Sequence, residues 1–155
     1  MLRLPSNQRQ YDEYWSGDPA FVQPDDTDES RAEHTTKVKR ARETGDWSPL
    51  VIEGQRPTLF VMRQVRSTQK NWIGDQYRRE KIGDLVLLEL FFRCALVKIV
   101  DSGIKTLDEF KHANHPELGP ICPDKVIDTL GEINPSLVSE LASASIEKVR
   151  NLNPL

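Results

Sequence analysis

The chain has few of the residues that cross-link small proteins or bind metal clusters. Its 155 residues include two cysteines, Cys94 and Cys122, too few for a disulfide framework or a thiolate zinc cluster. Cys94 lies within an apolar stretch, where a reduced and packed thiol is expected. The composition therefore indicates a protein of a reducing compartment whose stability comes from its core.

The sequence also lacks a segment suited to cross a membrane. Its longest apolar stretch, residues 85–100, is shorter than a membrane-spanning helix and contains three charged residues. The opening residues 1–5 lead directly into polar sequence, so we expect no signal peptide. The net charge of −3 does not favour nucleic acid or an anionic membrane as a partner. We expect a soluble cytosolic protein.

Recognisable catalytic motifs are missing as well. The sequence contains no glycine-rich phosphate loop, nucleophile elbow or His-Glu-x-x-His helix. His112, His115 and Cys122 offer three zinc-ligand types, but no fourth ligand follows at a standard spacing, and turn or cap roles explain the histidines. We therefore expect no enzyme, no catalytic or metal-binding residue, no cofactor and no small-molecule substrate.

The strongest positive signal is the stretch Leu85–Val100, in which thirteen of sixteen residues are apolar. Asp84 can cap its start and Gly103 can follow its end. A helix that is apolar on nearly every face must be surrounded by other elements. This pattern predicts a buried central helix over about residues 85–100.

The first 48 residues differ in composition from the rest. Seven acidic residues and no Lys or Arg lie between residues 10 and 30, and the overall apolar fraction of 37% is low for a globular chain. The acidic stretch nevertheless contains four aromatic side chains, and aromatic residues dominate protein-binding hot spots. We interpret this stretch as an extended arm with protein-binding anchors, although the aromatic residues could instead fold back onto their own domain. These anchors are Tyr11, Tyr14, Trp15 and Phe21.

A short polar helix is predicted within the same region. The capping-box pattern that begins at Ser30 and the glycine at Gly45 mark its ends. Its basic cluster, residues 37–42, is balanced by the preceding acids, so contact with nucleic acid is not favoured. The helix is therefore expected to be exposed or covered by a partner.

Ordered structure is expected to begin at Pro49. Residues 50–52 and 58–65 are rich in β-branched and aromatic residues and predict a β-hairpin over about residues 50–65. Helical patterns follow over residues 67–83, 106–110, 124–133 and 135–152. The predicted fold class is α+β: residues 1–48 form the arm with its polar helix, and residues 49–155 form a compact, mostly helical domain with one hairpin.

The order of these elements resembles that of small tail-assembly chaperones and related minor structural proteins of tailed bacteriophages. The resemblance covers about residues 50–155 and rests on the segments PTLFVMRQV, ALVKIVD and LGEINPSLVSELASASIEKVRNLNP. The matching positions are Thr58–Val65, Ala95–Asp101, Pro135, Leu141, Ile146, Asn153 and Pro154. The segment before Trp47 is not part of that pattern, and long arms are typical of proteins that remain in the virion.

The resemblance implies a non-enzymatic virion structural or assembly protein. Its partners would be other phage structural proteins of the tail or capsid, with self-association as a further option, and it would act in the host cytoplasm during assembly or within the virion. Binding would use the arm and the hairpin edge. The alternative is a cytosolic adaptor or regulator of a host protein that uses the acidic-aromatic segment as its binding peptide.

Overall fold

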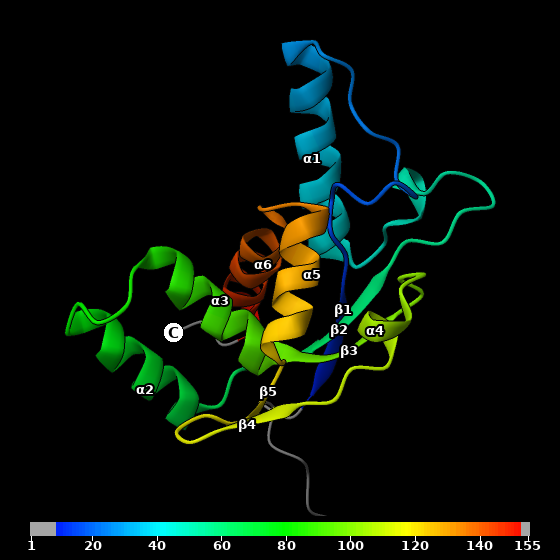
Figure 1. Cartoon of the computed structure of the whole chain (residues 1–155). Helices are drawn as coiled ribbons and strands as arrows, with labels where there is room; N and C mark the ends of the chain where they lie inside the picture. The colour runs from blue at the N-terminus through cyan, green and yellow to red at the C-terminus, as the bar shows by residue number, and fades with distance from the viewer. Residues whose placement is uncertain (1–8, 153–155) are drawn as a thin grey trace, which may run out of the picture.

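The computed structural model describes residues 9–152, with side chains described as far as residue 148. Over this range the chain forms six α-helices, a three-stranded antiparallel sheet and a separate two-stranded sheet (Figure 1). The predicted α+β class is therefore confirmed. Asn153 and Pro154, which belong to the resemblance, lie outside the described residues.

The three-stranded sheet has the order β1–β2–β3. Its central strand, β2 (Leu59–Arg63), pairs antiparallel with β1 (Gln10–Glu13) on one side and with β3 (Leu96–Val100) on the other. Four of the five residues of β2 are apolar. This composition suits a central strand that is paired on both edges and packs into the core. A register shift after Val61 interrupts its ladder with β3.

The hairpin predicted over residues 50–65 does not form as expected. Its second strand is β2, but residues Ser48–Leu50 form a 3-10 helix, and Val51 makes a single antiparallel bridge to Phe21 instead of pairing with β2. Pro49 lies in the first turn of this 3-10 helix, where its missing N–H costs nothing. The hairpin among the described residues lies later, where β4 (Ala113–His115) pairs with β5 (Gly119–Ile121).

The apolar stretch 85–100 is one helix followed by one strand. Helix α3 (Asp84–Ala95) ends where Leu96 adopts an extended backbone, and residues Leu96–Val100 form strand β3. Val97, Ile99 and Val100 favour a strand because β-branched side chains fit a pleated surface. The prediction of a helix to residue 100 is thus wrong in its last five residues, although Phe92 and Leu96 lie in the core as expected.

Residues 10–21 are part of the folded body. β1 forms one edge of the sheet, and the Tyr11 hydroxyl lies 2.6 Å from the Ser145 hydroxyl of the last helix. The main chain then turns and runs beside residues 50–52. The Val22 amide donates to the Leu50 carbonyl, and the Ile52 amide donates to the Ala20 carbonyl. An arm separate from residues 49–155 is therefore the wrong description of this segment, because backbone pairing and aromatic burial attach it to them.

Helix α1 (Asp28–Thr44) projects from the rest of the molecule, at the top of Figure 1. It begins two residues before the predicted Ser30, because the Thr27 side chain caps the Ser30 amide. It ends at Gly45, whose positive φ of 75° closes the last turn, as predicted. Only Val38 and Ala41 of this helix are buried, so most of its surface is exposed.

Helices α2 (Ser67–Arg78) and α3 form a helical hairpin on the left of Figure 1. Gly74 lies inside α2 and does not interrupt it. After α2 the chain turns through Glu80, which adopts a left-handed φ of 57°, and reaches Gly83 at the start of α3. The turn joining the two helices is the outermost part of this hairpin (Figure 1).

The remaining helices complete the core beside the sheet. The short helix α4 (Lys105–Asp108) precedes the β4–β5 hairpin, and α5 (Asp124–Ile133) and α6 (Leu137–Leu152) follow it. The side chains of Asn134 and Ser136 cap the approach to α6. The core is formed by buried side chains from the sheet, α2, α3, α5 and α6, among them Met62, Ile73, Phe92, Leu130 and Leu141.

Candidate protein-interaction surface

The four predicted anchors all pack against the protein's own core. Phe21 is 1% exposed and stacks on Trp47, with ring centroids 5.1 Å apart and an interplanar angle of 21°. Tyr14 packs edge-on against Phe21 at 6.0 Å. These rings form a small cluster with Val38 of α1, so Tyr14 and Phe21 fasten α1 to the loop that contains Trp47.

The other two predicted anchors contact the main core. The Tyr11 ring lies under the Lys148 ammonium, 4.6 Å from the ring centroid, and burial raises the pKa of its hydroxyl to about 12. The Trp15 ring covers Gly17, where a Cβ would lie 2.5 Å from the indole. Phe21 is thus too deeply buried to be an anchor, because a partner could engage its ring only by displacing it from the core. Tyr11, Tyr14 and Trp15 pack against the core but keep partly exposed faces, so their role as anchors stays a prediction.

A buried ion-pair network connects α1, β1 and α6. Arg42 of α1 donates from Nε to Glu13 at 3.2 Å and from Nη2 to Glu140 at 2.7 Å. Its Nη2 also donates to the Tyr14 carbonyl, and the guanidinium lies 5.3 Å from the centre of the Trp47 ring. The Arg42 side chain thus links α1 to the β1 segment, to α6 and to the Trp47 ring, and its role is to hold these segments together.

The two carboxylates of this network differ in environment. Glu13 is 3% exposed, and burial raises its pKa more strongly than Arg42 lowers it. Glu140 is partly exposed and also accepts hydrogen bonds from the Ser16 amide and hydroxyl, at 2.8 and 2.6 Å. Both carboxylates help to hold the N-terminal segment to α1 and α6, so their contacts are those of structural groups.

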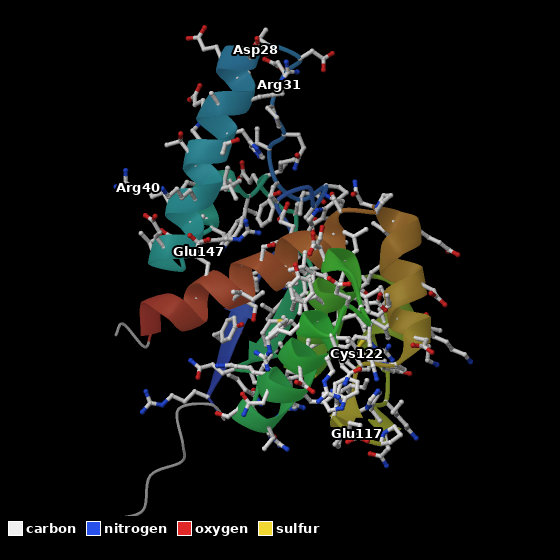
Figure 2. The ribbon with its side chains drawn as sticks, turned by 90° about the vertical axis from the view of Figure 1, so that its left-hand side faces the viewer. Asp28, Arg31, Arg40, Glu117, Cys122 and Glu147 are labelled. Atoms are coloured by element: carbon white, nitrogen blue, oxygen red, sulfur yellow. The ribbon has the colours of Figure 1, made fainter. Side chains whose placement is uncertain are left out.

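A polar cleft of about 630 Å³ lies between α1 and α6. Figure 2 shows α6 passing across the foot of α1, with Glu147 beside it. The cleft is lined by Lys39 and Glu43 of α1 and by Glu147 and Lys148 of α6, with Arg42 at its base. His34 lies higher on the same wall, and its buried Nε2 has no hydrogen-bond partner among the described residues. Charges of both signs alternate here, so the cleft favours no single class of ligand.

The histidines and cysteines considered as zinc ligands have structural contacts. His112 Nε2 lies 2.9 Å from the Leu96 carbonyl, and His115 Nδ1 accepts hydrogen bonds from the Glu117 and Leu118 amides. Cys122 is buried, and burial raises its pKa to about 12. Within residues 9–152, no group of three or more His, Cys, Asp or Glu side chains is placed to hold a metal ion.

The α2–α3 turn and its flanks present exposed apolar side chains. Leu85, in the first turn of α3, is 76% exposed, and Val86 and Tyr77 are 43% and 41% exposed. These residues and the turn between them, Tyr77–Val86, are called the hairpin end below. Three large exposed apolar side chains within ten residues differ from the isolated exposed apolar residues that are normal on a surface, so the hairpin end is a candidate interaction site.

Polar contacts hold the hairpin end in place. The Tyr77 hydroxyl donates to the Asp84 carboxylate at 2.6 Å, and this bond is the main cause that raises the pKa of Tyr77. Arg78 and Arg79 both pair with Asp75, at 3.7 and 3.3 Å. The hydrogen bond ties the last turn of α2 to the first turn of α3, so the apolar side chains are presented on a closed turn.

The turn between α2 and α3 borders a shallow, open hollow of about 580 Å³. Partly buried Ile82 contributes to its lining, and the other lining residues are Tyr77, Arg78, Glu80, Lys81 and Gly83. Leu85 follows Gly83, the last residue lining the hollow, by two positions, so an exposed apolar side chain and a partly apolar hollow belong to the same turn region. This surface is not predicted from the apolar run 85–100, which favours a buried helix, whereas Leu85 and Val86 are exposed. The adjacent Gly83-Asp84 start signal could have indicated that they lie at an exposed helix end.

Comparisons with known proteins find no matching family model, no similar curated protein and no similar solved structure. Over residues 9–152, none of the helices has the length and apolar character needed to span a membrane. The surfaces of the molecule therefore carry the functional argument.

Proposed function

We propose that this protein is a non-enzymatic structural or assembly protein of a tailed bacteriophage, and that it binds protein partners through the hairpin end. The observation that carries the proposal is the exposure of Leu85, Val86 and Tyr77 together on one closed turn. Burial of apolar area drives most protein association, at roughly 25 cal/mol per Å². A surface of this kind favours recognition by contact over chemistry on a small molecule.

The buried network at Arg42 supports the same proposal. Its carboxylates are occupied by the guanidinium and by Ser16, an arrangement suited to stabilising a fold. The resemblance to phage tail-assembly and minor structural proteins supplies the class of partner, which is other tail or capsid proteins. The place of action would be the host cytoplasm during assembly, or the virion itself.

The binding surface in this proposal differs from the arm first expected to carry it. Phe21 and Tyr11 contribute to the core and to the α6 contact, so they are committed to folding. The hairpin end lies on another side of the molecule from the projecting α1 (Figure 1). A partner seated there would leave the ion-pair network and the aromatic cluster intact.

Particle incorporation tests the proposal. Particles purified from producing cells on a density gradient are analysed by quantitative mass spectrometry, with the wild-type chain, Leu85→Asp or Ile133→Asp as the only copy. Ile133 of α5 is a matched control, because it is an apolar residue at 45% exposure outside the hairpin end. We expect the wild type and Ile133→Asp to be present in particles or assembly intermediates, and Leu85→Asp to be reduced at least tenfold. Absence of the wild-type chain from both would overturn the proposal.

A further inference from the structure

We infer that the partner seated on the hairpin end is a second copy of this chain, related by a two-fold axis so that each Leu85 enters the hollow of the other copy. This inference rests on the proposed function, because it takes the hairpin end to be a protein-binding surface. It goes beyond that proposal in naming the occupant and the geometry of the contact.

The shape of the hairpin end is the first argument. In a two-fold contact the same surface is used on both subunits, so it must contain both a projection and the cavity that receives it. Leu85 supplies the projection at 76% exposure, and the open hollow lined by Tyr77 and Ile82, in the turn that precedes it, supplies the receiving surface. The hairpin end has both the projection and the receiving surface that a two-fold contact requires, whereas binding of an unrelated partner would require only one of them.

Charge complementarity is the second argument. Glu80 and Lys81 are neighbouring exposed residues of opposite charge at the rim of the hollow, and neither forms an ion pair with any side chain described up to residue 148. A two-fold axis through the hairpin end brings Glu80 of each copy toward Lys81 of the other. The ionisable residues from Asp75 to Asp84 are three acids and three bases, so two copies meet without net repulsion although the whole chain has a charge of −3.

The remaining charged groups at this surface are already paired within one copy. Asp75 is shared by Arg78 and Arg79, and Asp84 accepts the Tyr77 hydroxyl. The contact therefore depends on the two unpaired residues for its specificity and on Leu85 for apolar burial. Because the apolar area is small, the dimer belongs to the class of weak and reversible associations.

Sedimentation equilibrium of the full chain, at protein concentrations from about 5 μM to about 1 mM, tests the inference. We expect a reversible monomer–dimer equilibrium for the wild type and for Ile133→Asp. Leu85→Asp should raise the dissociation constant at least tenfold, with an unchanged circular-dichroism spectrum. A wild-type chain that stays monomeric throughout, or a dimer unaffected by Leu85→Asp, would overturn the inference.

A charge-reversal pair tests the two-fold geometry directly. In Lys81→Glu both crossed contacts become Glu–Glu, and in Glu80→Lys both become Lys–Lys, so each variant alone should dimerise at least tenfold more weakly at low salt. An equimolar mixture restores two attractive contacts and should form a heterodimer. This recovery should weaken at about 0.5 M salt, where exposed charges are screened. If the mixture associates no better than the separate variants, the two-fold arrangement is wrong.

The two proposals fail in different ways. A monomeric chain whose incorporation into particles is still lost in Leu85→Asp would overturn the self-association and support the proposed function with another protein on this surface. A dimer that is lost in Leu85→Asp while incorporation stays unchanged would support the self-association and overturn the hairpin end as the assembly surface.

Discussion

Arg42 of α1 donates a 2.7 Å hydrogen bond to Glu140 of α6, a residue 98 positions later in the chain, while its Nε is held by Glu13 of β1. This one side chain joins a projecting helix, an edge strand and the last helix. The Arg42 side chain is largely buried, at 21% exposure, and the Glu13 side chain is more deeply buried at 5%. The contact therefore makes Arg42 the cation that hydrogen-bonds both carboxylates.

Replacement of Arg42 by Met should destabilise the protein by about 3 kcal/mol, because Glu13 would then be buried without its charge partner. Urea unfolding followed by circular dichroism measures the change. The double variant Arg42→Met/Glu13→Gln should recover part of the loss, since a neutral amide replaces the orphaned charge. Lys39→Met, an exposed change on the same helix, should stay within about 0.5 kcal/mol of the wild type. Equal losses in the single and double variants would show that Glu13 is not the affected group.

The raised pKa of Glu13 predicts a pH dependence of a definite sign. The folded state binds this proton more tightly than the unfolded state, whose pKa is the usual one near 4.5. The stability that it contributes is therefore fully present below about pH 4.5 and is lost as the pH rises through the folded-state pKa. We expect the unfolding free energy of the wild type, relative to that of Glu13→Gln, to decrease between pH 4 and pH 7. A relative stability that rises over this interval would contradict the assigned shift.

Phe21→Ala should cost about 3–5 kcal/mol, because the ring is buried against Trp47 and a cavity would remain. Thermal and urea unfolding of the isolated protein measure the loss. Val22→Ala is the neighbouring control, since Val22 is 55% exposed and its truncation should change stability by less than about 0.5 kcal/mol. A fully stable Phe21→Ala protein would favour the arm interpretation of this segment after all.

Two adjacent phenylalanines of α3 distinguish the observed helix from a uniformly buried one. Phe92 is completely buried and Phe91 only partly, so Phe92→Ala should cost about 3–5 kcal/mol and Phe91→Ala less than half as much. Urea unfolding of both variants under one set of conditions gives the comparison. Equal losses would indicate that α3 is surrounded on both faces.

Much of the helical structure could be predicted from local patterns. Apolar spacing and a start signal mark α5 at Asp124–Ile133, and Gly45 marks the end of α1. The run after Ala95 was misread because a short continuous apolar segment fits a helix or a buried strand equally well by periodicity. The β-branched residues Val97 and Ile99 were the available signal for a strand.

Strand β1 and the hairpin end could not be predicted in the same way. The sequence Gln-Tyr-Asp-Glu has little strand character, and β1 exists because its main chain pairs with β2 far along the chain. The exposure of Leu85 likewise depends on tertiary packing, because α2 and α6 pack against other parts of α3 and leave its first turn exposed. Composition could show that Tyr11 and Phe21 were aromatic residues in an acidic stretch, but only packing decides whether such rings face a partner or a core.

The contact between Tyr11 and Ser145 joins residues 134 positions apart and closes the first strand against the last helix. During synthesis, the hydrogen bonds within α1 and α2 need only nearby residues, but their stable burial needs the rest of the fold. The core, in contrast, cannot be completed before α6 is synthesised, because Leu137, Leu141 and Ala142 of that helix belong to it. A nascent chain halted before residue 137 would present the apolar strand β2 and the inner face of α3 to the cell. Its survival at that stage depends on chaperones or on rapid completion of translation.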